Sequence, residues 1–212
     1  MRRSILRTAA AGAAVLALTA CGDSGGGGGG DTATAEESTA VAEAGSASRA
    51  VLRTAEGTEV GTVQFSEVAA GTEVVAEVQG LEPGFYGLHV HGTGLCEPES
   101  SAPGRPDTTG AFLSAGGHLG ADAGDHPEHT GDLPSLYVTE DGVGELTTVT
   151  DRFGVADLLA DDDGSAVMVH SGPDNYANIP ERYAEGGPDE DTTKTGDAGD
   201  RLACGVVEAE EG

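Results

Sequence analysis

The stretch FYGLHVHGTGLC, residues 85–96, places two histidines one residue apart in a run that otherwise has the composition of a buried strand. Because side chains alternate between the two faces of a strand, His89 and His91 project to one side and Val90 to the other. Imidazole is a usual protein ligand of copper and zinc. A lone histidine is most often a surface or hydrogen-bonded core residue, whereas this spacing indicates a strand that brings two ligands to one place.

Short strand-like runs lie on both sides of this stretch. SRAVLRT, TEVGTVQFSEV, TEVVAEVQG and GFYGLHVH come first, and LPSLYVTEDG, GELTTVTDRF, SAVMVHSG and RLACGVVEAE follow. The 35 glycines favour turns and loops, and only DLLADDDG indicates a helical turn. These eight runs predict an all-β fold, an antiparallel sandwich or barrel.

Two long segments interrupt the strands, residues 92–132 and residues 171–200. Both are rich in Gly, Pro, Asp and Thr and lack strand periodicity. Loops of this length in a compact domain are usually either functional or disordered. Every histidine of the chain lies within one of them or at its edge, namely His89, His91, His118, His126, His129 and His170. We therefore predict two long functional loops.

The segment GGHLGADAGDHPEHTGD gathers possible ligands most densely. It carries His118, His126, His129 and Asp132, and three histidines with one carboxylate form a closed tetrahedral set of the kind that zinc takes. The alternative is a polar loop in which the histidines occur by chance. VMVHSGPD ends another strand with His170, again at the mouth of a loop.

The first residues, MRRSILRTAAAGAAVLALTAC, have a basic start and a short apolar run before a cysteine. The run is too short to span a bilayer and has the features of an export signal. Residues 18–21, LTAC, resemble the lipobox of bacterial lipoproteins, in which the cysteine is acylated. We predict a lipoprotein signal peptide at residues 1–20 and lipidation of Cys21, with an ordinary secretory signal as the alternative.

A small, acidic, low-complexity stretch follows, so we expect residues 21–47 to comprise the lipidated cysteine and a flexible tether. The folded domain is predicted at residues 48–212. The formal charge of the chain is -27, which repels nucleic acid and anionic lipid, so no nucleic-acid partner is expected. With Cys21 lipidated, Cys96 and Cys204 remain as a pair in an oxidising setting, although ligation of a metal by their thiolates stays open.

Five motifs, in this order, resemble the successive signatures of the copper/zinc superoxide dismutase family. They are GLHVHGTGLC, SAGGHLG, HTGDLPSL, MVHSGPDN and TKTGDAGDRLACGV, and the resemblance covers the chain from about residue 48 to residue 207. It implies an eight-stranded antiparallel Greek-key β-barrel or flattened sandwich.

The resemblance also implies roles for individual residues. It makes His118 a bridge between two metals and Asp174 a carboxylate that links the two sets of ligands. It implies a disulfide between Cys96 and Cys204, and it places Arg201 beside the copper, with Thr195 and Lys194 lining the channel. The implied copper ligands are His89, His91, His118 and His170, and the implied zinc ligands are His118, His126, His129 and Asp132.

The sequence departs from the family pattern at two places. Only Pro127 and Glu128 separate His126 from His129, where the family usually has a longer spacer, and related bacterial enzymes exist that hold copper without zinc. Residues 97–117, EPESSAPGRPDTTGAFLSAGG, form a long insertion between Cys96 and His118.

The implied activity is the disproportionation of superoxide to O2 and H2O2 by copper that alternates between Cu(II) and Cu(I), with His118 taking up and delivering a proton. Superoxide is an anion, and Arg201 and Lys194, the only lysine of the chain, are expected to form a local positive funnel within an acidic protein. We expect the enzyme to act outside the cytoplasm, anchored to the bacterial cell membrane, and the resemblance is compatible with a homodimer. The alternatives are a surface protein that binds copper or zinc without turnover and a β-sandwich adhesion module with a degenerate site.

Overall fold

A computed structural model describes residues 46–210. The predicted signal peptide at residues 1–20, Cys21 and the tether as far as residue 45 lie outside the described residues. No helix among the described residues is long and apolar enough to cross a membrane.

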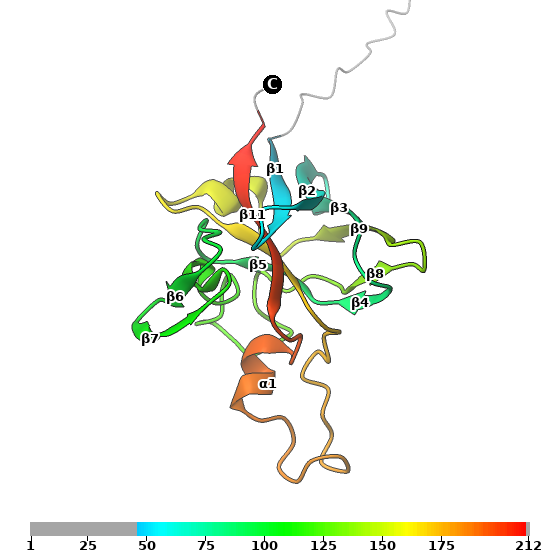
Figure 1. Cartoon of the computed structure of the whole chain (residues 1–212), viewed down its shortest axis with the longest axis vertical. Helices are drawn as coiled ribbons and strands as arrows, with labels where there is room; N and C mark the ends of the chain where they lie inside the picture. The colour runs from blue at the N-terminus through cyan, green and yellow to red at the C-terminus, as the bar shows by residue number, and fades with distance from the viewer. Residues whose placement is uncertain (1–45, 211–212) are drawn as a thin grey trace, which may run out of the picture. The chain divides into compact units, whose positions relative to one another are not determined.

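The structure is built from antiparallel strands and three short helical segments (Figure 1). All eight strand-like runs of the sequence form strands, as predicted. The strand count is higher than eight because Gly87 divides GFYGLHVH into two strands and residues 97–117 add a hairpin. The strands are β1 (Ala47–Thr54), β2 (Glu59–Val68), β3 (Gly71–Gln79), β4 (Gly84–Tyr86), β5 (Leu88–His91), β6 (Ser100–Ala102), β7 (Arg105–Gly110), β8 (Leu136–Val138), β9 (Val143–Thr150), β10 (Ala166–His170) and β11 (Arg201–Ala209), and the helical segments are η1 (Leu113–Ala115), η2 (Val155–Leu159) and α1 (Glu190–Thr195).

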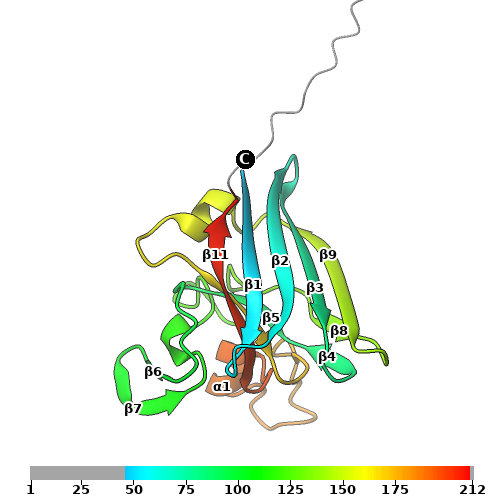
Figure 2. The same ribbon diagram turned by 45° about the horizontal axis from the view of Figure 1, so that its top comes forward.

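Nine strands form one sheet in the order β4-β8-β9-β3-β2-β1-β11-β10-β5, and β6 pairs with β7 in a separate small sheet (Figure 2). Strands β4 and β5 are consecutive in the chain, yet they occupy opposite edges of the large sheet. The sheet must therefore curl until its two edges approach each other, which gives a nearly closed barrel.

Gly87 lies where the two edges meet. Its N–H donates to Gly172 O and its carbonyl accepts from His170 N, each at 2.8 Å. A Cβ at this position would lie 2.6 Å from Ala198 Cβ, so glycine is required by the close approach of the chain.

Burial explains which strands carry the functional side chains. Strands β1 to β3 alternate buried and more exposed residues, as expected for one covered face. Every residue of β5 and β10 is buried. On one face, Leu88, Val90 and Val167 join the barrel core. The other face carries histidines, Ala166 and Met168, and the loops cover it.

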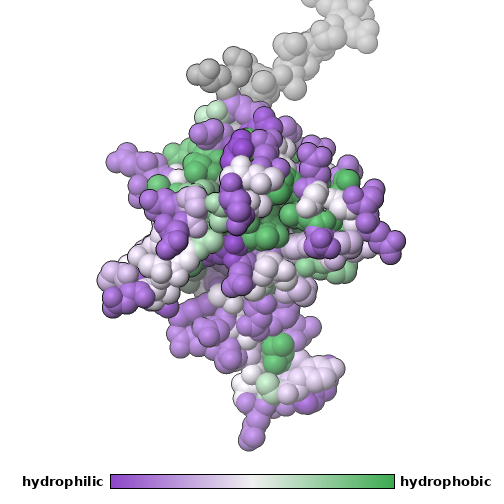
Figure 3. Space-filling model, in the orientation of Figure 1, coloured by the Kyte–Doolittle hydropathy of each residue, from purple (hydrophilic) through white to green (hydrophobic). Residues whose placement is uncertain are grey.

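The insertion at residues 97–117 supplies part of that cover. It forms β6, β7 and η1, and it ends in a small apolar cluster outside the barrel core. In this cluster Phe112 and Ala115 pack with Met168 and Cys204. Figure 3 shows that the hydrophobic surface on this side gathers mainly over the strands of the sheet, whereas the loops around α1 are mainly hydrophilic.

Candidate metal centre

All six histidines are buried and lie together between the loops and the face of β5 and β10 that is opposite the barrel core. Strand β5 supplies His89 and His91, and the end of β10 supplies His170. The loop that follows β5 folds back along it, because isolated antiparallel bridges pair His91 with His118 and His89 with Asp132. These two bridges bring loop residues that are distant in sequence directly beside the two strand histidines.

One set of ligands consists of His89, His91, His118 and His170, whose candidate ligand atoms all lie within 4.8 Å of one another. In three of these rings one nitrogen is held by an acceptor. His89 Nε2 donates to Asp174 Oδ2 at 2.7 Å, His91 Nδ1 to Gly116 O at 2.9 Å and His170 Nδ1 to Gly199 O at 3.2 Å.

The opposite nitrogens of these three rings are His89 Nδ1, His91 Nε2 and His170 Nε2. Each is buried and has no hydrogen-bond partner within residues 46–210. A neutral imidazole that donates from one nitrogen carries a lone pair on the other, and a buried lone pair without a partner is costly. Three such lone pairs that converge on one place fit a bound cation, and the acceptors on the opposite nitrogens fix the tautomer that ligation needs.

A second set surrounds the carboxylate of Asp132. Its Oδ1 lies 2.7 Å from His118 Nδ1, and its Oδ2 lies 3.0 Å from His126 Nδ1 and 3.1 Å from His129 Nδ1. His118 Nδ1 and His129 Nδ1 are 3.3 Å apart. Three ring nitrogens and one carboxylate thus occupy one small volume, the composition that zinc favours.

A different grouping, with His89 in place of His129, also falls within 4.8 Å. His89 cannot easily serve it, because its Nε2 is bound to Asp174 and its Nδ1 belongs to the first set. His129 fits better, since its Nε2 donates to Gly124 O at 3.1 Å and its Nδ1 is left facing Asp132. The short spacer between His126 and His129 therefore still lets both rings reach the same carboxylate.

Two residues connect the sets. His118 belongs to both. Asp174 binds one histidine of each, because its Oδ1 accepts from His126 Nε2 at 2.8 Å while its Oδ2 accepts from His89. Tyr176 N also donates to Asp174 Oδ1 at 2.7 Å, which holds the carboxylate in place. The structure thus brings together all the residues that the sequence predicts as metal ligands, together with Asp174.

The protonation states suit ligation on the first set. Burial lowers the pKa of His91 well below its usual range, that of His118 to about 4 and that of His170 to about 3. These rings are neutral at pH 7, the form in which imidazole binds a metal.

The carboxylates are held ionised. Burial alone would raise the pKa of Asp132 and of Asp174, but hydrogen bonds from the histidines keep both well below their usual range. For His126, hydrogen bonds to the two carboxylates outweigh the lowering effect of burial and raise its pKa to about 9. In the protein without metal, a proton on His126 therefore balances part of the negative charge.

A pocket of about 410 Å³ opens onto the first set. It is lined by His91, Gly117, His118, His170, Asp191, Thr195, Asp197, Gly199 and Arg201. Arg201 is the only arginine or lysine among these lining residues of the described chain. A small anion that enters the pocket therefore meets one fixed positive charge beside the histidines.

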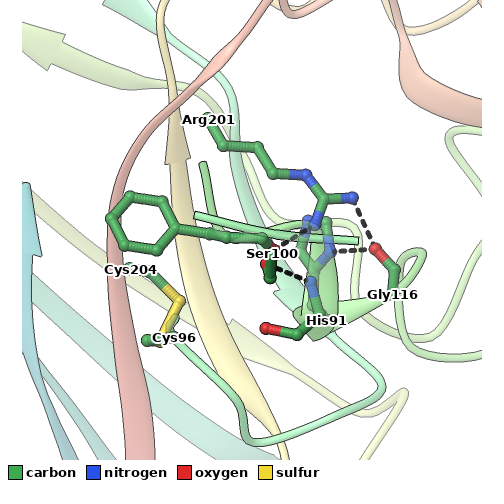
Figure 4. The surroundings of a disulfide bond; sticks show 8 residues. His91, Cys96, Ser100, Gly116, Arg201 and Cys204 are labelled. Atoms are coloured by element: carbon green, nitrogen blue, oxygen red, sulfur yellow. Dashed lines mark hydrogen bonds between the residues drawn. A yellow bond between two sulfur atoms is a disulfide. The ribbon is translucent and has the colours of Figure 1, made fainter. Parts of the chain in front are cut away.

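Arg201 is held by the insertion. Its Nη1 donates to Phe112 O at 2.6 Å and its Nη2 to Gly116 O at 2.5 Å. Gly116 O also accepts from His91 Nδ1, so a single carbonyl positions both the arginine and a histidine of the first set. Figure 4 shows this arrangement beside the disulfide of Cys96 and Cys204, whose formation confirms the implied pairing.

Lys194 departs from expectation. Thr195 lines the pocket as expected, but Lys194 does not, because its Nζ forms an ion pair with Glu190 on the exposed face of α1. Residues four apart on a helix lie side by side, which explains the pair. Asp191 and Asp197 line the pocket instead, so the expected funnel of two positive groups is reduced to Arg201.

Several residues of the site carry no signal in the sequence. Phe112 and Gly116 act through backbone carbonyls, which any residue possesses. Tyr176 stacks on His126 with an interplanar angle of 15°, and its hydroxyl accepts from Ser135 N at 2.8 Å. Arg152 donates to the carbonyls of Pro127 and His129.

Comparisons with known proteins agree with this geometry. Residues 59–207 match the family described as copper/zinc superoxide dismutase. The chain is 47% identical over 168 residues to a copper-zinc superoxide dismutase of Mycolicibacterium paratuberculosis, with 74% of this chain and 72% of that protein covered. It is 34% identical over 157 residues to the copper-zinc superoxide dismutase of Escherichia coli K12, with 71% of this chain and 80% of that protein covered.

Solved structures show the same architecture. The crystal structure of the clock protein EA4 matches with a TM-score of 0.60 and 29% identity and covers 79% of this chain and 97% of that one. A double mutant of a superoxide dismutase-like protein from Bacillus subtilis matches with a TM-score of 0.55 and 25% identity, covering 74% of this chain and 95% of that one.

Proposed function

The chain belongs to the copper/zinc superoxide dismutase family, and on this basis we propose which residues hold its metals and how they act on superoxide. His89, His91, His118 and His170 bind copper. The zinc ligands are His118, His126, His129 and Asp132. The observation that carries the assignment is the convergence of buried, unpartnered ring nitrogens on one point beside an open pocket.

Copper held by these histidines would supply the one-electron chemistry for the disproportionation of superoxide to O2 and H2O2. The chain's own residues arrange the reactants. Asp174, Gly116 and Gly199 fix the ring orientations of His89, His91 and His170 through the nitrogens opposite the unpartnered ones, which would hold copper. Asp132 fixes His118 through Nδ1, which leaves Nε2 as the atom that can hold and release a proton on the copper side.

Arg201 attracts and orients the anion. Its guanidinium is immobilised by two carbonyls, so its remaining N–H groups are available at a fixed position in the pocket. A group held in place before the substrate arrives does not lose its freedom on binding. The acidic side chains of the surface repel the anion over a longer range, but salt screens interactions between charges that are more than about 8 Å apart at physiological ionic strength.

The competing function is a surface protein that binds copper or zinc without turnover. Such a protein needs the histidines, but it needs neither an open pocket on the copper side nor an arginine held within it. Both features are present here, and both favour the enzyme.

We place the enzyme outside the cytoplasm, with its N-terminal end anchored in the membrane by acylated Cys21. The basic and apolar start of the sequence supports export, and the disulfide between Cys96 and Cys204 supports an oxidising compartment. Expression of the full chain in a bacterial host tests the anchor. Wild-type protein is expected in the membrane fraction and the Cys21→Ala variant in the soluble extracytoplasmic fraction. Equal partition of the two would contradict the anchor.

The catalytic proposal is tested by measuring superoxide disproportionation and metal content on the same samples. Full-length chain loaded with copper and zinc is compared with His170→Ala, which removes one proposed copper ligand, and with Arg49→Ala, which changes an exposed residue of β1. We expect rapid turnover for wild type and Arg49→Ala and loss of both copper and turnover in His170→Ala. Full copper occupancy of the wild type without turnover would favour the non-catalytic protein.

A further inference from the structure

The backbone between His126 and His129 is held from outside its own loop. Arg152 Nη1 donates to Pro127 O at 2.7 Å and to His129 O at 3.0 Å. Arg152 comes just after β9, and the two carbonyls lie 25 and 23 residues before it in the chain. One guanidinium nitrogen therefore ties together the two ends of the spacer.

The backbone next to Arg152 is anchored in the barrel core. The next residue, Phe153, is buried, its carbonyl accepts from Thr72 Oγ1 at 2.8 Å, and its ring packs edge-on against Phe65. The Arg152 side chain is exposed. It therefore extends from an anchored backbone to the loop that carries His126 and His129, without being part of the core.

The spacer needs such support because of its length. With only Pro127 and Glu128 between them, His126 and His129 must both direct Nδ1 to the same oxygen of Asp132, at 3.0 and 3.1 Å. A two-residue spacer has few backbone conformations that allow this. Small changes in the peptide planes next to the histidines would move the ring nitrogens apart.

The other polar groups of His129 are already bound within its own loop. Its backbone N–H donates to Asp132 Oδ2 at 2.9 Å, and its Nε2 donates to Gly124 O. The carbonyl of His129 accepts from Asp132 N at 3.2 Å within the loop and from Arg152 Nη1 at 3.0 Å from outside it. The contact from Arg152 thus ties the backbone of this residue to a segment outside its own loop.

We propose that Arg152 is a positioning residue for zinc, which acts by holding the backbone carbonyls that orient His126 and His129. The inference rests on the zinc ligands proposed above. It assigns to Arg152 no contact with copper, with superoxide or with the metal itself.

The direction in which zinc affinity changes when Arg152 is removed distinguishes a positioning role from a purely electrostatic one. Arg152 is a positive charge close to a site for a divalent cation, and on charge alone its removal would strengthen zinc binding. If its hydrogen bonds position the ligands, its removal weakens zinc binding instead. Loss of an outer partner of metal ligands typically costs about 10-fold to 100-fold in affinity.

The experiment measures the zinc affinity of the full chain, oxidised at its disulfide, by competition with a chromophoric chelator. The variants are Arg152→Ala, Arg152→Lys and, as a matched loss of one exposed arginine, Arg49→Ala. Copper affinity and the melting temperature of the metal-free protein are measured on the same preparations. These two readouts show whether an effect is confined to the zinc ligands.

We expect Arg152→Ala to bind zinc about tenfold more weakly or worse. The copper affinity of Arg152→Ala should stay within about twofold of wild type. His89, His91 and His170 are held by Asp174, Gly116 and Gly199, and not by Arg152. Arg152→Lys should recover part of the affinity, because an ammonium can also donate to carbonyls, and Arg49→Ala should match wild type.

Unchanged or tighter zinc binding by Arg152→Ala, with normal binding by wild type, would overturn the inference alone. An equal loss of copper and zinc affinity together with a large fall in melting temperature would also overturn it, because the role would then be structural. Wild-type protein that binds no zinc would overturn the proposed zinc ligands and this inference with them.

Discussion

Asp174 Oδ2 lies 2.7 Å from His89 Nε2, so a loop carboxylate holds a histidine of the edge strand β5 through the nitrogen opposite its unpartnered Nδ1. The second oxygen of the same carboxylate accepts from His126, one of the proposed zinc ligands. The orientation of one ligand in each set therefore depends on a single side chain. We expect the two metal sites to respond together to changes at Asp174.

Asp174→Asn tests this link. Asparagine has nearly the same shape, but one of the two accepting oxygens becomes an NH2 group, which cannot accept from a histidine N–H. We expect zinc affinity, and copper affinity with it, to fall about tenfold or more in chelator competition. Asp107→Asn, an exposed site on β7, serves as the control. Wild-type affinity for both metals in Asp174→Asn would show that the carboxylate is not needed.

Arg201→Gln tests the pocket arginine. The variant keeps donors that can reach a carbonyl but loses the positive charge that draws in the anion. We expect kcat/KM for superoxide to fall about tenfold or more and its dependence on ionic strength to decrease. Copper and zinc content should be unchanged. Unaltered kinetics at low salt would remove Arg201 from the mechanism.

The disulfide contributes to the stability of the domain. Cys96 and Cys204 are separated by 108 residues, and the chain-entropy account assigns to a closed loop of this size about 4–5 kcal/mol. We expect the double variant Cys96→Ser with Cys204→Ser to lose several kcal/mol of unfolding free energy in urea titrations. The insertion that holds Arg201 should also loosen. Superimposable urea transitions would refute this contribution.

The stability of the metal-free protein should depend on pH with a definite sign. Burial lowers the pKa of His118 to about 4 and that of His170 to about 3, from a usual 6.5. Between pH 6.5 and these values the unfolded chain binds more protons than the folded one. The free energy of unfolding should therefore fall as the pH drops through this window. The depressed pKa values of Asp132 and Asp174 act in the same direction below about pH 4.

His126 acts with the opposite sign. Its pKa is raised to about 9, so its stabilising contribution is complete below about pH 6.5 and is lost as the pH rises toward 9. Denaturant titrations of the metal-free protein should give maximal stability near pH 6.5. The fall on the alkaline side should be smaller and should disappear in His126→Asn. A stability that rises steadily from pH 6.5 to pH 9 in wild type would contradict this assignment.

Much of the barrel could be predicted from local sequence. Alternation in the runs around residues 48–79 and 143–150 marks strands with one covered face, and the structure confirms them. The division of GFYGLHVH at Gly87 could not be predicted, because it results from the two edges of the sheet meeting there. The hairpin of residues 100–110 could not be predicted either, because its strands are short and exposed and so lack an alternation of buried and exposed residues.

The histidines and Asp132 could be found because metal ligands require particular side chains at particular spacings. The groups that orient them could not. Gly116 and Gly199 accept hydrogen bonds at their backbone carbonyls, and Arg152 donates to backbone carbonyls. Every residue has such a carbonyl, so the sequence does not reveal these contacts. Lys194 was wrongly expected in the channel, because only the helix shows that it faces Glu190.

We propose that the buried ring nitrogens of His89, His91, His118 and His170 form one copper site on this barrel. The most direct test is electron paramagnetic resonance of the full chain loaded with one equivalent of Cu(II). A single centre with hyperfine coupling to several nitrogens, which is lost in His91→Ala, is the predicted result. A spectrum of oxygen-ligated or heterogeneous copper that His91→Ala leaves unchanged would show that these histidines do not form a copper site.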